Sequence, residues 1–504
     1  MKTASVAIKD KPVLESGKCS LESNSKSEGE EEPPGKTTLS SNLEEEPPGK
    51  SATNRCRFFG HIADSSWNDW KWHFRNRITT VEQLTNFISL TIEEQIQLKL
   101  VTQRYPFSVT PYYLSLINPD DPDDPIRKQA IPSILEITMG MMGQEDPLAE
   151  KRDSVVPGLV HRYPDRVLMV LTNICPMLCR HCTRKREWQY GGWVRTLDEV
   201  EAMLDYLRQH KTVRDVVISG GDPLTLSTRY LEDIISRIRK ISHIEIMRIG
   251  TRFPVVLPQR IDDELCAMLS RYGPIWLNTH FNHYREITPE AAAACDRLLR
   301  SGVPVNNQSV LLRGVNDTVE TQTKLCQGLL KIKVRPYYLF QCDEVQGTEH
   351  LRTPVEVGIK IIEGMRGYTS GLAVPTFVVD LHQGGGKVPL QPNYVLAQTE
   401  GRLLLRNYEG HIFRYRNPKA VACPELATPV PQPAIDSVAS LFTEADFQPQ
   451  TEVARDKGRA VVRVRSNRRS TKPVNVPIAS LFTEADYQPQ VEVDRDEDRA
   501  VVRP

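Results

Sequence analysis

The sequence predicts an α/β fold, a partial TIM-like (β/α)6 barrel with a helical N-terminal domain and disordered terminal extensions. From about His161 strand-like runs alternate with helical patterns, which indicates parallel strands joined by helices. The chain has 504 residues and 39% hydrophobic content, enough for one large core, while both ends are rich in polar residues, Pro and Gly. We predict a leader over 1–53, the helical domain over 54–160, the barrel over 161–390, a short β region over 391–423 and a Pro-rich tail over 424–504.

Composition narrows the functional class. The leader repeats the phrase Glu-Glu-Glu-Pro-Pro-Gly-Lys at 30–36 and 44–50, and buries too little apolar surface to fold. The 64 basic and 64 acidic residues cancel, so nothing in the net charge favours nucleic acid or a membrane surface. Ten scattered cysteines and the lack of an apolar leader predict a cytoplasmic protein.

The helical domain is predicted to begin near three tryptophans at 67, 70 and 72. Helical patterns follow at 81–87 and 92–101, each beside a capping Thr or Ser. The tryptophans could stack on nucleic-acid bases, but aromatic residues in a helical segment favour a place in the core.

The barrel elements follow in order. The predicted strands are 167–172, 215–219, 244–250, 275–280, 303–311 and 334–340, with a further strand at 376–380. The predicted helices are 198–210, 229–241, 262–271, 289–301 and 318–332. Short β-like pieces at 394–398, 402–407 and 411–415 end the folded part. The tail then repeats the phrase Ala-Ser-Leu-Phe-Thr-Glu-Ala-Asp, which begins at 439 and again at 479. The two copies could be docking motifs on a flexible tail or simply solvated chain.

Three cysteines follow the first barrel strand. Cys175, Cys179 and Cys182 are spaced to hold three corners of a [4Fe–4S] cluster, which leaves one iron open for a chelating ligand. Zinc bound by these residues and His181, or buried cysteines without metal, would also fit the pattern.

Two further motifs lie at strand ends. The glycines of Ser219-Gly-Gly-Asp222 would let a ligand approach the backbone, and Asp222 could accept a hydrogen bond from an ammonium group, unless this is an ordinary turn. The run Gly384-Gly-Gly-Lys387 predicts a loop that carries a lysine able to form a Schiff base, or else a surface turn. Arg162 and Arg166 suit a phosphate dianion, unless they are ordinary surface charges.

The string Cys-Pro-Met-Leu-Cys-Arg-His-Cys-Thr-Arg-Lys-Arg at 175–186 resembles the lysine 2,3-aminomutase family of radical S-adenosylmethionine (SAM) enzymes. Further strings at 110–117, 278–283, 308–317 and 335–338 resemble the same family, so the likeness runs from Trp67 to Tyr415. It implies a radical SAM barrel and pyridoxal 5′-phosphate (PLP) as second cofactor. An imine to PLP would let nitrogen bridge two carbons once a 5′-deoxyadenosyl radical has removed a hydrogen atom.

The resemblance also implies a role for each site residue. Lys387 would be the catalytic residue that holds PLP, with Arg162 and Arg166 on its phosphate. The other implied sets are cluster ligands Cys175, Cys179 and Cys182; SAM contacts Gly220, Gly221, Asp222, His280 and Gln308; and substrate contacts Arg184, Asp343 and Asp380. Arg184 would pair the α-carboxylate, and the two acids the distal ammonium group.

Some positions depart from the family pattern. The loop before Lys387 reads Leu-His-Gln-Gly-Gly-Gly instead of Pro with four glycines, and Phe340 stands where bacterial members have tyrosine. Thr318 and a lone Cys423 stand in the region where members carry four zinc-binding cysteines, so we expect no structural zinc.

The function implied is conversion of L-lysine to β-lysine. Glutamate, or a lysine used to modify a translation factor, would be the substrate in related enzymes, but paired acids argue against glutamate. Two different functions also fit the sequence, an idle scaffold whose tail binds partners and a radical enzyme that acts on tRNA. The expected partners are a small amino acid, a flavodoxin- or ferredoxin-like electron donor and further copies of the chain, with no nucleic acid and no membrane.

Overall fold

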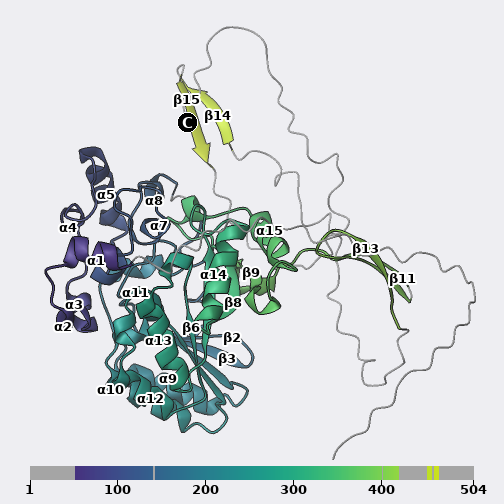
Figure 1. Cartoon of the computed structure of the whole chain (residues 1–504), viewed down its shortest axis with the longest axis horizontal. Helices are drawn as coiled ribbons and strands as arrows, with labels where there is room; N and C mark the ends of the chain where they lie inside the picture. Colours follow the sequence, from purple (N-terminus) through teal and green to yellow (C-terminus); the bar gives the residue numbers. More distant parts are fainter. Residues whose placement is uncertain (1–50, 140–141, 400, 419–450, 457–458, 465–504) are drawn as a thin grey trace, which may run out of the picture. The chain divides into compact units, whose positions relative to one another are not determined.

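The structure is a computed structural model that describes residues 51–139, 142–399, 401–418, 451–456 and 459–464 (Figure 1). It forms two compact units, Met1–Tyr394 and Val395–Pro504. The leader apart from 51–53, and both tail phrases at 439 and 479, lie outside the described residues. Helix α1 (Ser51–Phe59) includes the last three residues, 51–53, of the predicted leader.

The first unit is built on one ten-stranded sheet whose strands follow chain order, from β1 to β10. Seven neighbouring strands run parallel, and they correspond, within two residues at each end, to the six predicted barrel strands and the further one. They are β3 (Arg166–Val170), β4 (Asp215–Ser219), β5 (Ile246–Gly250), β6 (Ile275–Thr279), β7 (Val305–Leu311), β8 (Arg335–Gln341) and β9 (Thr376–Leu381). Because β1 and β10 remain as free edges, the barrel is not closed, and the predicted α/β fold class is confirmed.

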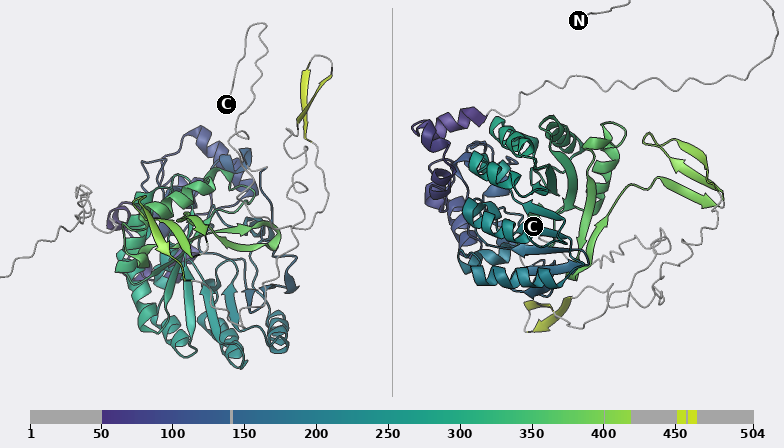
Figure 2. Two further views of the ribbon diagram at one scale, coloured as in Figure 1. Left: turned by 90° about the vertical axis from the view of Figure 1, so that its right-hand side faces the viewer. Right: turned by 90° about the horizontal axis from the view of Figure 1, so that it is seen from below.

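Helices cover the outside of the curved sheet (Figures 1 and 2). They are α9 (Leu197–Gln209), α10 (Thr228–Arg239), α12 (Asp263–Ser270), α13 (Pro289–Arg300), α14 (Val319–Lys331) and α15 (Val355–Met365), with the short α11 (Phe253–Val256). Strands β3, β4 and β5 alternate fully buried residues with partly exposed ones. The buried set, such as Met169 and Ile218, joins the main hydrophobic core, whereas Leu168 and Val217 line an internal cavity. One face of the sheet is therefore free for chemistry.

The N-terminal helices are short, apart from the 13-residue α5, and they pack against the barrel. They are α2 (Asp64–Trp67), α3 (Trp70–Arg75), α4 (Val81–Leu84), α5 (Ile92–Arg104), α6 (Pro111–Leu114), α7 (Arg127–Ala130) and α8 (Leu135–Thr138). Capping boxes at Thr80 and Thr91 begin α4 and α5, at the two predicted helix starts. Trp67 is buried against the ring of Phe59, as expected of a core residue.

The sequence did not predict the antiparallel edges of the sheet. On one side β1 (Ser154–Val156) and β2 (Leu159–Tyr163) precede β3, and on the other β10 (Gly386–Pro389) pairs with β9. The prediction that Lys387 lies on a loop is wrong, because it lies on β10 opposite Asp380. Positive φ angles at Gln383, Gly384 and Gly386 reverse the chain so tightly that it returns along β9.

The second unit contains a three-stranded antiparallel sheet of β11 (Val395–Thr399), β12 (Arg402–Arg406) and β13 (Ile412–Arg416), at the predicted β-like pieces. A separate hairpin pairs β14 (Thr451–Asp456) with β15 (Arg459–Val464). No helix in the described part of the chain has the length and apolar character needed to cross a membrane.

Candidate active site

One cavity of about 600 Å³ opens on the inner face of the parallel sheet. All fourteen side chains and glycines that the sequence nominated line it, although they come from segments far apart in the chain. These are Arg162, Arg166, Cys175, Cys179, Cys182, Arg184, Gly220, Gly221, Asp222, His280, Gln308, Asp343, Asp380 and Lys387. The carboxyl ends of parallel strands meet at this edge, as in other barrels of this class.

The three cysteines lie in the loop after β3. Their thiols are free, and the loop is anchored at Cys175, whose carbonyl accepts from Arg77 Nη1 at 2.8 Å. Burial raises the pKa of the Cys182 thiol to about 11 and that of Cys175 well above its usual value. Buried thiols of this kind stay protonated unless a metal takes the proton's place.

The donor set suits a cluster better than a single ion. Among the described residues, no three His, Cys, Asp or Glu side chains are arranged around a single metal ion. His181, which would be the fourth ligand of a zinc ion, is buried, which lowers the pKa of its ring, and its Nε2 lies 3.3 Å from Asn282 Nδ2. Three cysteines at this spacing fit a cubane, in which each cysteine binds its own iron and one iron stays open.

The glycine pair after β4 allows two loops to touch. A Cβ on Gly220 would lie 2.3 Å from the Thr172 carbonyl oxygen, and one on Gly221 would lie 2.5 Å from the Ile174 carbonyl oxygen. Only glycine lets this turn pack against the start of the cysteine loop. The next residue, Asp222, accepts hydrogen bonds from Thr251 Oγ1 at 2.7 Å and from the Arg252 backbone amide at 2.8 Å.

Burial raises the pKa of Asp222 to about 7. In His280, which follows β6, burial and the nearby Arg252 lower the pKa to about 4, so the ring is neutral. The Nδ1 atom of His280 lies 2.7 Å from the carbonyl oxygen of Gln308 on β7. These residues form a polar wall of the cavity, in which the His280 ring is neutral at pH 7.

The two phosphate-site arginines lie at the β2–β3 hairpin. Arg162 Nε lies 2.9 Å from Asp153 Oδ2, whereas the guanidinium of Arg166 lies 4.2 Å from the centre of the Tyr163 ring. A Cβ on Gly384 would lie 3.2 Å from Arg162 Nε, so the glycine run lets the segment before Lys387 pass against this hairpin. Lys387 donates its backbone amide to Tyr163 Oη at 3.1 Å.

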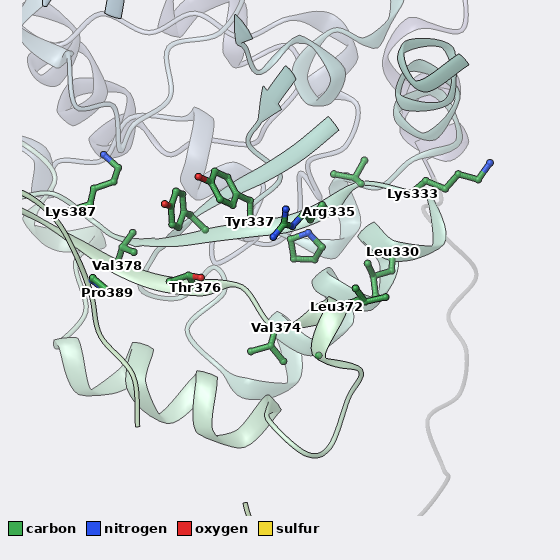
Figure 3. A pocket seen from close by; sticks show the side chains of 14 residues that line it. Leu330, Lys333, Arg335, Tyr337, Leu372, Val374, Thr376, Val378, Lys387 and Pro389 are labelled. Carbon is green, nitrogen blue, oxygen red and sulfur yellow. The ribbon is translucent and has the colours of Figure 1, made fainter. Parts of the chain in front are cut away.

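Lys387 Nζ lies 2.9 Å from Asp380 Oδ1 and 5.3 Å from the centre of the Phe340 ring. Lys387 also borders a second cavity, of about 540 Å³. In Figure 3 the amine of Lys387 points away from Val378 and Pro389, which line that cavity. Burial, and next the charge of Asp380, raise the pKa of Asp343 to about 7. The lysine and both acids therefore form one electrostatically coupled group.

Sequence reasoning missed the partners of Arg184. Its Nε and Nη2 bind Glu150 at 2.9 and 2.6 Å, and its Nη1 donates to the Gly220 carbonyl at 2.9 Å. Burial opposes ionisation of Glu150, but Arg184 and Arg186 hold its pKa at about 2. Glu150 lies in a loop without any motif, so no local signal marked it. Arg252, by contrast, lies two positions after the end of β5, and its position near a strand end was such a signal.

A buried charge cluster attaches the cysteine loop to the N-terminal helices. Glu136, on α8, has no exposed surface and binds Arg180 Nε at 2.9 Å and Lys185 Nζ at 2.7 Å. Arg180 lies between two of the cysteines, and Lys185 follows the third by three positions. Burial lowers the pKa of Lys185 to about 8, although Glu136 opposes the effect.

We expect Glu136→Gln to destabilise the fold by roughly 3–5 kcal/mol, because it leaves two buried cations without their shared anion. Chemical unfolding of the metal-free protein, followed by circular dichroism, measures this. Glu82→Gln is the matched control, since Glu82 pairs with Lys99 at 2.7 Å in solvent and should matter little. Equal stability of the two variants would contradict the anchoring role.

Comparison with known proteins now defines the class. The model of the radical SAM superfamily matches residues 169–321, which carry β3 to β7, and that of lysine-2,3-aminomutase matches 362–497. The L-lysine 2,3-aminomutase of Clostridium subterminale is 54% identical over 72% of this chain and 88% of its own length. That of Bacillus subtilis is 49% identical over 71% and 76%.

The glutamate 2,3-aminomutase of Clostridioides difficile is 42% identical over 72% of this chain and 86% of its own length. The fold and the matches make this protein a radical SAM enzyme. Within that class, the chain belongs to the lysine 2,3-aminomutase family.

Proposed function

We propose that the protein is a radical isomerase that moves the α-amino group of L-lysine to the β-carbon and so forms β-lysine. The observation that carries the proposal is the cavity whose wall is lined by three thiols, a lysine, the two arginines Arg162 and Arg166, and two acids. Each set suits a different component of the reaction, and the relatives named above are lysine aminomutases.

Membership of this family brings a [4Fe–4S] cluster, SAM and PLP as cofactors. Cys175, Cys179 and Cys182 would hold the cluster, and the glycine turn with Asp222, His280 and Gln308 would accommodate SAM. Lys387 would bind PLP, with Arg162 and Arg166 on its phosphate. When bound, cluster and SAM supply an organic radical, and PLP delocalises the spin while the amino group migrates.

The protein's own charges would orient the substrate. Arg184 would receive the α-carboxylate, and Glu150 holds the guanidinium in place through two of its nitrogens. Asp343 and Asp380 would receive the distal ammonium group. Two acids facing one carboxylate would repel it, so this charge pattern favours lysine over glutamate as substrate.

The pKa of Asp343 predicts how binding depends on pH. Because the acid is protonated below about pH 7, its attraction for the ammonium group is lost as the pH falls. We expect KM for lysine to rise by up to about tenfold per pH unit below that point, while kcat changes less. Asp380→Asn removes the neighbouring charge and should move this rise to lower pH. A rise at the same pH in both proteins would contradict coupling between the two acids.

The test of the function is product analysis after anaerobic reconstitution with iron, sulfide, PLP, SAM and a reductant. L-Lysine and L-glutamate are offered separately, and we expect a β-amino acid from lysine alone. Formation of β-glutamate would make glutamate the substrate and would overturn the proposal.

We also propose a cytoplasmic location, a flavodoxin- or ferredoxin-like electron donor and a homo-oligomer that binds neither nucleic acid nor a membrane. The support for self-association is the second unit. Its three-stranded sheet leaves large apolar side chains exposed, among them Leu396, Ile412 and Phe413. Three strands without a packed face are marginally stable alone, so a further copy of the chain is a suitable cover.

A further inference from the structure

Arg252 is a buried arginine that reaches a cluster-site thiol and that the proposed function does not use. It follows β5, and 7% of its surface is exposed. Its Nη1 donates to Cys179 Sγ at 3.0 Å, and its Nε donates to the carbonyl oxygen of His280 at 3.0 Å. Its Nη2 donates to Glu286 Oε1 at 2.8 Å and to Gln129 Oε1 at 2.5 Å. Every nitrogen of the guanidinium is therefore held by a partner.

The surroundings keep this cation directed at the sulfur. Glu286, which has no exposed surface, also accepts from Tyr113 Oη at 2.6 Å and from the backbone amide of Asn282 at 2.6 Å. Glu286 binds Nη2 of Arg252, whereas Nη1 faces Cys179, so this carboxylate does not contact the part of the cation nearest the sulfur. An arginine keeps its charge even when buried, so part of a positive charge lies permanently beside Cys179.

Arg260 and Arg77, two other arginines near the site, contact backbone carbonyls instead of a thiol. Arg260 donates to the carbonyl oxygens of Leu224 and Leu226, at 2.9 and 3.2 Å. Arg77 donates to the carbonyl of Cys175 and not to its thiol. These contacts hold the chain in place, whereas the contact of Arg252 changes the electrostatic potential at a ligand atom.

We infer that Arg252 is a positioning residue that raises the reduction potential of the cluster through its hydrogen bond to Cys179. This inference rests on the proposed function, which places a [4Fe–4S] cluster on the three thiols. One-electron reduction, from [4Fe–4S]2+ to [4Fe–4S]+ by an external one-electron donor, adds one negative charge and breaks no bond. A cation and a hydrogen bond at the ligand sulfur stabilise the more negative form, and so ease delivery of the electron.

The test is a potentiometric titration of the reconstituted protein without SAM, in which electron paramagnetic resonance counts the reduced cluster. We expect Arg252→Gln to shift the midpoint potential to a more negative value. Glu286→Gln should shift it in the opposite direction, because the charge of Arg252 is then less neutralised. Arg260→Gln is the matched control, a buried arginine with no thiol contact, and should leave the midpoint unchanged.

Iron and sulfide content is measured first for every protein. A wild-type chain that does not take up four irons would refute the proposed function, and this inference with it. With four irons bound, an unshifted midpoint in Arg252→Gln would overturn the inference alone. If Arg252→Gln does not fold, the Glu286→Gln protein provides the test. An unchanged or more negative midpoint potential in Glu286→Gln would overturn the inference equally.

Discussion

Replacing Lys387 with alanine removes the visible absorption of bound PLP and abolishes β-lysine formation, while four irons per chain remain. This is the expected result, because Lys387 is a lysine that lines the same cavity as Arg162, Arg166 and the three thiols. Its side chain contacts Asp380 and its backbone amide contacts Tyr163, and neither residue belongs to the cysteine loop. Loss of this amine should therefore spare the cluster.

Absorption spectra, iron analysis and product chromatography on one preparation measure the three outcomes together. Lys331→Ala, at an exposed position at the end of α14, is the control for loss of a lysine as such. Full PLP absorption in the Lys387→Ala protein would place the PLP-binding lysine elsewhere in the chain.

Asp343→Asn is the second change with a large expected effect. Removing one charge from a buried charge pair costs roughly 2–5 kcal/mol, so kcat/KM for lysine should fall by about a hundredfold or more. Cleavage of SAM without amino acid should change far less, since Asp343 follows β8 and is coupled to Asp380 and Lys387 rather than to the glycine turn.

Steady-state kinetics with lysine, alongside deoxyadenosine formation without it, separates the two effects. Glu344→Gln is the control, because this neighbouring acid is partly exposed and pairs with His382 at 2.9 Å. Equal loss of turnover and of SAM cleavage in Asp343→Asn would rule out a substrate-binding role.

Much of the fold follows from local patterns. Alternation of strand and helix patterns predicted the parallel strands, because a strand buried on one face and a helix with one apolar stripe each leave a periodic signal. The edge strands β2 and β10 were not predicted from the sequence. Strand β2 reads Leu-Val-His-Arg-Tyr, a short segment without clear alternation, and β10 begins within a glycine run that resembles a loop. Pairing between distant segments, rather than local preference, makes these residues strands.

In the candidate site, too, residues marked by a local motif could be predicted from sequence, whereas contacts between distant segments could not. Thiol spacing and glycine turns are local, so Cys175, Gly220 and Lys387 could be nominated from sequence. The contact between Arg252 and Cys179 spans 73 positions, and that between Arg184 and Glu150 spans 34. Such pairs exist only once the strands are placed side by side, and the sequence contains no period or motif that announces them.

The most direct test of the central claim uses L-lysine labelled with nitrogen-15 at the α-amino group. After anaerobic turnover by the reconstituted enzyme, nuclear magnetic resonance locates the label. Intramolecular migration predicts β-lysine with the label on the β-nitrogen and no labelled ammonia in solution. Labelled ammonia, or labelled lysine returned unchanged while SAM is consumed, would contradict the assignment of this protein as a lysine aminomutase.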